Sequence, residues 1–175
     1  LNLYKFTKNK VIVKPINLKK STAKELQDNS LLFRLGDREH SKGILQSQIK
    51  SINQSNKTTI LALHKAKELA IEMYDSLKEN DLTKFSDILN RGWESKRNYT
   101  KGITNKRIEM VSRKAIENGA KALKVTGAGG GGHFFIYANP SKHNSIIKSL
   151  KKLGVNNVDF KYQNQGAKVF EINNL

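Results

Sequence analysis

Residues 122–137 read ALKVTGAGGGGHFFIY, in which a run of glycine separates two apolar segments. Ala122 to Val125 and Phe134 to Tyr137 have the short apolar character of buried strands. Consecutive glycines adopt positive φ and expose bare N–H groups, so a glycine loop between strands either wraps an anion or admits another backbone. A flexible linker or a loosened hairpin is the alternative, but linkers usually run longer and lie between domains. The stretch therefore predicts a structured loop in contact with phosphate or nucleotide.

The segments that follow this loop predict the fold. A helix is expected from Pro140 to Leu153, because Asn139 is suited to cap its start and Gly154 to follow its end. Strands are expected at 158–162 and 167–172. Together with an earlier apolar strand, this order predicts an α+β fold, namely a ferredoxin-like split β-α-β layer with an inserted helical subdomain on a largely antiparallel sheet.

The chain before the glycine loop predicts a hairpin, a short helix, a strand and a run of helices. Leu1 to Phe6 and Val11 to Val13 alternate around a turn and end at Pro15, as a hairpin does. Thr22 to Glu25 matches a capping box, which predicts that the short helix starts there. The strand Leu31 to Leu35 follows and is broken by Gly36.

The helical region carries apolar stripes that we interpret first as core. Helices are expected to begin at Asp81 and near Asn105, with Gly119 ending the latter. The predicted inward faces are Ile44, Leu45, Ile49 and Ile52; Ile60, Leu63, Ala70, Tyr74 and Leu77; Leu82, Phe85, Ile88, Leu89 and Trp93; and Ile108, Val111, Ala115 and Ile116.

Composition limits the classes of function. The 175 residues include 32 Lys and Arg against 15 Asp and Glu, a net charge of +17, with no cysteine. The lysines are scattered, which favours a solvated surface over a nucleic-acid footprint, since the latter usually forms a clustered basic stripe with aromatic partners. No apolar run reaches transmembrane length and no signal peptide is recognisable, so we predict a cytoplasmic protein without a membrane partner.

Residues 124–137 resemble the third motif of the GHMP kinases, the superfamily of galactokinase, homoserine kinase, mevalonate kinase and phosphomevalonate kinase. The flanks are similar to the sugar-kinase branch typified by heptose 7-phosphate kinases, and the resemblance extends over essentially the whole chain. The similar flanks are Leu31-Leu32-Phe33-Arg34-Leu35-Gly36, Leu61-Ala62-Leu63-His64, Gly92-Trp93, Val158-Asp159-Phe160 and Gln165-Gly166-Ala167-Lys168-Val169.

The resemblance implies transfer of the γ-phosphoryl group of ATP to a sugar hydroxyl with Mg²⁺, the sugar being a heptose 7-phosphate for nucleotide-activated surface sugar synthesis. Such chemistry rests on positioning and on neutralising phosphate charge. The resemblance implies that the glycine loop contacts the nucleotide phosphates or forms a wall of the active-site cleft. The residues carried over are Gly127, Ala128, Gly129, Gly130, Gly131 and Gly132.

Two basic residues are further candidates for binding the sugar phosphate. Lys124 fits the family pattern just before the loop, and a surface or strand-edge lysine is the alternative. Arg38 lies where the family's turn approaches the sugar, and its planar guanidinium suits a phosphate, while an exposed loop arginine or a helix-cap partner is the alternative. His133 departs from the large apolar residue usual in this branch. His40, His64 and His143 show no ligand spacing, so no metal site is predicted.

Two parts of the family pattern are absent from this sequence: a Pro-x-Gly-Leu-Gly-Ser-Ser phosphate loop and an acidic residue that activates the hydroxyl. Both belong to the family's amino-terminal domain, and the sequence starts at Leu1 inside a predicted strand. We therefore expect no catalytic residue here, a missing amino-terminal kinase domain as partner, and a chain that alone binds ATP weakly and turns nothing over. The alternatives are a non-catalytic ligand-binding or interaction module and a basic nucleic-acid-binding domain.

The expected organisation has three segments. Residues 1–35 form the tail of the amino-terminal domain, with its hairpin and short helix, together with the first strand of the carboxy-terminal domain. Residues 36–120 form the helical region, and 121–175 form the glycine loop and the split β-α-β segment. The last segment is expected to pack as one domain with 31–120.

Overall fold

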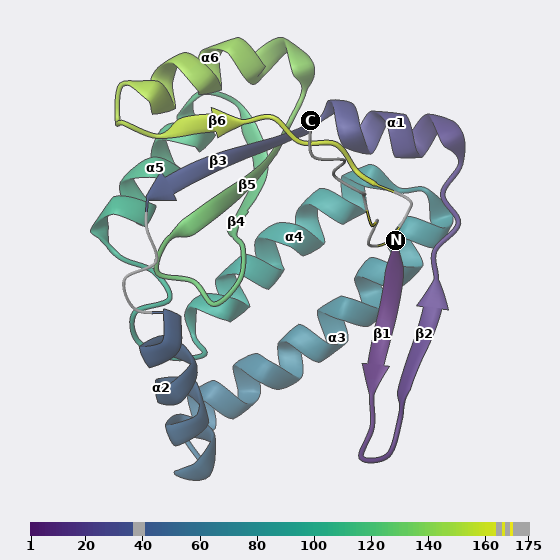
Figure 1. Ribbon diagram of the computed structural model, residues 1–175, viewed down its shortest axis with the longest axis vertical. Helices are drawn as coiled ribbons and strands as arrows, with labels where there is room; N and C mark the ends of the chain where they lie inside the picture. The colour runs from purple at the N-terminus through teal and green to yellow at the C-terminus, as the bar shows by residue number, and fades with distance from the viewer. Residues whose placement is uncertain (37–40, 164–165, 167–168, 170–175) are drawn as a thin grey trace, which may run out of the picture.

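The computed structural model describes residues 1–36, 41–163, 166 and 169, and the side chains of 41 and 42 lie outside that description. Its helices and strands follow the predicted order (Figure 1). They are β1 (Asn2–Phe6), β2 (Val11–Pro15), α1 (Lys20–Asp28), β3 (Ser30–Gly36), α2 (Ser41–Asn53), α3 (Lys57–Glu79), α4 (Leu82–Arg97), α5 (Lys106–Glu117), β4 (Ala120–Val125), β5 (Gly132–Ala138), α6 (Pro140–Lys151) and β6 (Asn156–Val158).

The main sheet has four strands in the order β4-β5-β3-β6, and each neighbouring pair is antiparallel. The two central strands are the first and third of these four in sequence, which is the arrangement of a split β-α-β fold. Helices α2 to α5 are inserted between β3 and β4, and α6 connects β5 to β6. The predicted fold class is confirmed.

The largest core fills the sheet face covered by α5 and α6. Phe33, Phe134 and Ile136 extend from the two central strands and are completely buried. Val111 of α5 and Ile146 of α6 pack against them and are equally inaccessible. The apolar residues of the central strands and those of α5 and α6 therefore meet in one core.

A second, smaller core joins α1, α3 and α4 to the other face of β4 and β5. Phe85 of α4 contacts Tyr137 of β5 edge to face, with 5.3 Å between ring centroids. The Tyr137 hydroxyl accepts a hydrogen bond from the Asn29 amide at 3.0 Å, which satisfies the buried phenol. This core fixes α4 beside β4, where the Asn90 amide also donates to the Lys121 carbonyl at 2.8 Å.

Among the helix starts that the structure describes, four have a residue whose side-chain oxygen accepts a backbone N–H, as N-caps do. Three of the four were predicted: Asp81, Asn105 and Asn139. The fourth, Asn56, starts α3. The predicted cap at Thr22 is wrong, because α1 already begins at Lys20 and Thr22 is buried in its first turn.

The predicted inward faces hold for α4 but not for α2. Leu82, Phe85, Ile88, Leu89 and Trp93 are all buried. In α2 only Ile44 is buried, while Leu45, Ile49 and Ile52 are 52%, 57% and 40% exposed.

Four further sequence predictions differ from the structure or fall outside the described residues. The stripe on α3 is rotated, since Leu69 is buried and Ala70 exposed, and Ile116 of α5 is 59% exposed. The strand predicted at 158–162 lies instead at Asn156–Val158, where it pairs with β3. The strand predicted at 167–172 falls mostly outside the described residues.

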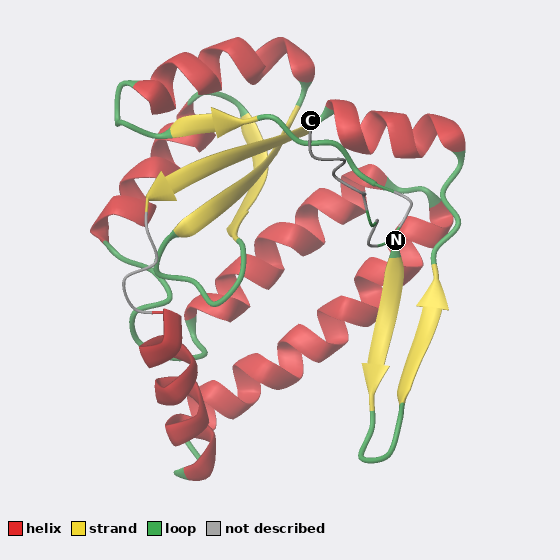
Figure 2. Cartoon of the chain, in the orientation of Figure 1, coloured by secondary structure: helices red, strands yellow, loops and turns green. Residues whose placement is uncertain are grey.

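The hairpin β1–β2 extends alone from the rest of the molecule (Figure 2). Its register places Tyr4 opposite Val13 and Phe6 opposite Val11, so these four apolar side chains share one face. All four are at least half exposed, and Phe6 is 76% exposed. An isolated two-stranded hairpin is marginally stable in water.

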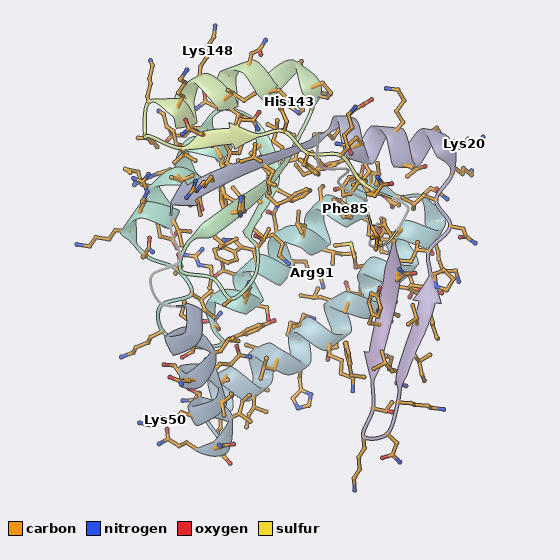
Figure 3. The ribbon with its side chains drawn as sticks, in the orientation of Figure 1. Lys20, Lys50, Phe85, Arg91, His143 and Lys148 are labelled. Carbon is orange, nitrogen blue, oxygen red and sulfur yellow. The ribbon has the colours of Figure 1, made fainter. Side chains whose placement is uncertain are left out.

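Basic side chains are spread over the surface. Lys20 on α1, Lys50 on α2 and Lys148 on α6 lie on three separate helices and are exposed (Figure 3). Within the described ranges, no helix combines the length and the apolar character needed to cross a bilayer.

Candidate functional site at the glycine loop

The glycine loop connects β4 to β5 at one end of the main sheet. Thr126 closes its base, since its N–H donates to the His133 carbonyl at 2.9 Å. Four glycines of the loop have positive φ, whereas Ala128 and Gly131, which lie between them, do not. The positive values are +69° at Gly127, +104° at Gly129, +74° at Gly130 and +81° at Gly132.

Several backbone N–H groups of this loop are available to a ligand. Those of Gly127, Ala128, Gly129 and Gly131 donate to no acceptor among the described residues. Successive N–H groups on backbone that alternates between left- and right-handed conformations form a concave nest that binds anions. The loop thus has the donors and the backbone geometry that a phosphate group requires.

The loop is held from both sides. The N–H of Gly130 donates to the Ile103 carbonyl at 2.8 Å, and the Asn105 side-chain amide donates to the Gly130 carbonyl at 3.2 Å. On the other limb, the Lys96 ammonium donates to the Val125 carbonyl at 3.2 Å and also to the Gly127 carbonyl. Sequence analysis missed Lys96, Ile103 and Asn105 as loop contacts, because they lie more than twenty residues away without a recognisable spacing.

Close packing explains why glycine is needed at two positions. A Cβ at Gly129 would lie 3.0 Å from the Cα and the carbonyl oxygen of Ile103. A Cβ at Gly130 would lie 2.6 Å from Cδ1 of Ile44 on α2. Both contacts are shorter than an ordinary carbon contact, and both positions have positive φ, which disfavours any side chain. The loop is a fitted part of the core rim and not a slack linker.

Lys124 lies on β4, two residues before Thr126, opposite Phe135 of β5. Its side chain does not enter the glycine loop but lines a cavity of about 210 Å³ between α3, α4 and β4. Burial lowers the pKa of the Lys124 ammonium below its ordinary value, because desolvation disfavours the charged form. Lys96 lines the same cavity, so one lysine contacts both the cavity and the loop.

The remaining polar candidates do not gather at the loop. Arg38 and His40 lie outside the described residues. His64 is exposed on α3, and His143 of α6 hydrogen bonds through Nε2 to the Ala138 carbonyl at 3.1 Å. His133 pairs across the strands with Arg34. Across the described ranges, no cluster of three or more His, Asp or Glu side chains is placed to hold a metal ion.

Comparison with known proteins bears on this loop directly. The family "GHMP kinases C terminal" matches residues 73–156, a span from the end of α3 to the start of β6 that includes the whole loop. The chain contains a GHMP kinase C-terminal domain.

Relatives of this GHMP domain include a heptose kinase and sugar kinases of known structure. The D-glycero-alpha-D-manno-heptose 7-phosphate kinase of Campylobacter jejuni is 31% identical over 172 residues, which cover 98% of this chain and 50% of that protein. A crystal structure of a candidate sugar kinase from Campylobacter jejuni superposes with a TM-score of 0.68 at 29% identity, covering 94% of this chain and 46% of that one. The chain thus spans about half the length of the Campylobacter jejuni heptose kinase, although the match covers nearly all of this chain.

A third comparison confirms the fold. A D-glycero-D-manno-heptose 1-phosphate kinase from Bacteroides thetaiotaomicron matches with a TM-score of 0.63 at 24% identity, over 97% of this chain and 45% of that chain. The predicted GHMP resemblance is therefore confirmed, and it extends beyond the GHMP domain to the hairpin and α1.

Proposed function

We propose that this chain forms the carboxy-terminal part of an ATP-dependent sugar kinase, and that its substrate is a heptose 7-phosphate used for nucleotide-activated surface sugars. The observation that carries the proposal is the N–H nest of the glycine loop, which lies inside the GHMP domain. The 31% identity to a heptose 7-phosphate kinase supports the choice of sugar. Because the reaction consumes ATP, we place it in the cytoplasm.

In this proposal the loop contacts the nucleotide phosphates. Phosphoryl transfer depends on preorganised donors that neutralise charge on the transferring group. The N–H groups of Gly127, Ala128, Gly129 and Gly131 are such donors, while Gly130 and Gly132 shape the loop. The described part of this chain has no cluster of carboxylates that would hold the Mg²⁺ ion. Arg38 remains a proposed contact to the sugar phosphate. Lys124, the other basic residue predicted for that role, lines the cavity between α3, α4 and β4.

We further propose that an amino-terminal kinase domain is the partner of this chain and that the isolated chain is inactive. The exposed apolar face of the hairpin supports this, since Tyr4, Phe6, Val11 and Val13 are uncovered. A contiguous apolar face of this kind marks an interaction surface. The sequence similarity to the Campylobacter kinase covers this hairpin as well.

The test is to fuse the chain to the amino-terminal half of the Campylobacter jejuni heptose kinase and to measure ADP release with ATP, Mg²⁺ and heptose 7-phosphate. We expect sugar-dependent ADP release from the fusion, none above background from the chain alone, and strong loss with Gly129→Ala in the fusion. A fusion that folds and binds ATP yet releases no ADP with the sugar refutes the sugar assignment. Turnover by the chain alone refutes its proposed incompleteness.

A further inference from the structure

The cavity between α3, α4 and β4 has an unusual lining. Small residues leave the space open: Ala66 and Ala70 on α3 and Gly92 on α4. An added Cβ at Gly92 would meet nothing within 4 Å, so the space beside this position of α4 is open. The rest of the wall is mostly apolar and consists of Leu69, Met73, Ile88 and Leu89. The volume of about 210 Å³ is ample for a small organic molecule.

Two polar groups in this lining have no partner in the described part of the chain. The Lys124 ammonium takes part in no hydrogen bond or ion pair there, and neither does the Tyr99 hydroxyl. Tyr99 hydrogen bonds through its backbone: its N–H donates to the Lys96 carbonyl at 3.1 Å, and its carbonyl accepts from the Thr59 hydroxyl at 2.9 Å. Burial raises the pKa of the Tyr99 phenol and lowers the pKa of the Lys124 ammonium, so both groups are desolvated.

Lys124 and Tyr99 are partly buried, and neither polar atom is completely enclosed. A partly desolvated charge is stabilised when an opposite charge or hydrogen-bond acceptor meets it. The cavity lining includes no Asp or Glu that would supply one. The neighbouring cation, Lys96, already donates to the Val125 and Gly127 carbonyls. An oxyanion in the cavity would supply the acceptor that these two donors lack.

We propose that this cavity binds a small organic anion, whose carboxylate or phosphate group accepts hydrogen bonds from Lys124 and Tyr99 and whose body is apolar. The apolar body of the ligand is inferred from the lining of the cavity. The hydroxyls of a sugar would lose their hydrogen bonds to water against Leu69, Met73, Ile88 and Leu89. The site is separate from the N–H nest of the glycine loop. Lys96 lines the cavity and also donates to the Gly127 carbonyl of the loop. A ligand in the cavity would therefore lie beside a contact that holds the glycine loop.

The test measures protection of Lys124 from acetylation. The folded chain is treated with limiting acetic anhydride at constant ionic strength and pH, and acetylation at each lysine is read by peptide mass spectrometry. The added probes are hexanoate, acetate, inorganic phosphate and glucose 6-phosphate. We expect hexanoate to slow acetylation of Lys124 at least about fivefold at saturation, and acetate or phosphate to do so only at higher concentration. Lys121, which is exposed on the same strand, serves as the internal control and is not protected.

Two variants separate binding from folding effects, and circular dichroism confirms that each is folded. Lys124→Met keeps the aliphatic stem and removes the charge, so the rise in melting temperature caused by hexanoate disappears, whereas Lys121→Met retains it. Tyr99→Phe removes only the hydroxyl and weakens hexanoate binding about tenfold, the usual effect of one hydrogen bond to a charged group.

Three results would overturn the proposal. The first is that no probe protects Lys124 in the wild type. The second is that Lys124→Met still responds to hexanoate. The third is that glucose 6-phosphate protects better than hexanoate, which would assign the cavity to a phosphorylated sugar. None of these results depends on kinase activity, so the proposed function stands or falls separately.

Discussion

Replacing Gly129 with alanine tests whether the glycine loop is a rigid, fitted structure. Gly129 has a φ of +104°, outside the region that alanine adopts readily. Holding a side chain there costs about 1–3 kcal/mol. The new Cβ would also lie 3.0 Å from the Cα and carbonyl oxygen of Ile103, which are backbone atoms that cannot rotate aside. Overpacking of this kind adds about 1–3 kcal/mol.

The expected loss of unfolding free energy for Gly129→Ala is therefore about 4 kcal/mol as a central value. For a chain of this size it lowers the melting temperature by roughly 8–16 °C. Urea unfolding followed by far-UV circular dichroism measures the loss. Gly43→Ala is the matched control, because an added Cβ there meets nothing within 4 Å and alanine favours the helix by up to about 1 kcal/mol. A loss below about 1 kcal/mol for Gly129→Ala would show a slack loop and refute the reasoning.

Three other substitutions test individual contacts. Lys96→Met removes the donor to the Val125 and Gly127 carbonyls, so we expect the free energy of unfolding to fall by about 1–3 kcal/mol. Hydrogen exchange should show faster amide exchange across the loop, and unchanged exchange would contradict the anchoring role of Lys96. The hydrogen bond from Arg91 lowers the pKa of Glu72 below 4.5, so the pair's stabilisation is present above that pH and is lost as the pH falls through the lowered pKa. Glu72→Gln should flatten this acid limb in urea titrations, and an unchanged limb argues against the pair. Burial lowers the pKa of Lys124 below 10.5, so the unfolded chain binds the extra proton and stability rises with pH between the lowered pKa and 10.5. Lys124→Met should abolish that rise, and its persistence would show that another group titrates.

The sequence predicted the helices and strands whose own residue pattern determines which side chains are buried. The strand Leu31 to Leu35 and the strands beside the glycine loop were predicted from short apolar runs, and most of their residues are buried. The stripe on α4 is buried along the whole predicted face. Asp81, Asn105 and Asn139 act as caps because a short polar side chain at a helix start needs only its own backbone.

Predictions failed where the outcome depends on what lies across from a segment. The stripe of Leu45, Ile49 and Ile52 is regular, but within the described residues no element covers it, and only Ile44 reaches the core. Thr22 has the spacing of a capping box, but α1 begins two residues earlier and Thr22 is buried in its first turn. Neither failure is visible in the local pattern, because packing overrides local signals.

The candidate site shows the same division. The glycine run alone predicted a loop with exposed N–H groups, since only glycine adopts such backbone readily. Its supports were not predictable, because Lys96, Ile103 and Asn105 reach the loop through the arrangement of α4, the following connection and α5. The position of the Lys124 side chain in the cavity between α3, α4 and β4 was not predictable either, because it depends on how the two helices pack on β4.

The account depends on the glycine loop as an anion site, which amide NMR of the isolated chain tests residue by residue. Titration with ATP and Mg²⁺ should shift the amide resonances of Gly127, Ala128, Gly129 and Gly131 most, with weak affinity, and tripolyphosphate should shift the same set. The amides of α6 should not move, and Gly129→Ala should abolish the pattern. Shifts confined to other surfaces, or none at concentrations of ATP that saturate weak sites, would contradict the account.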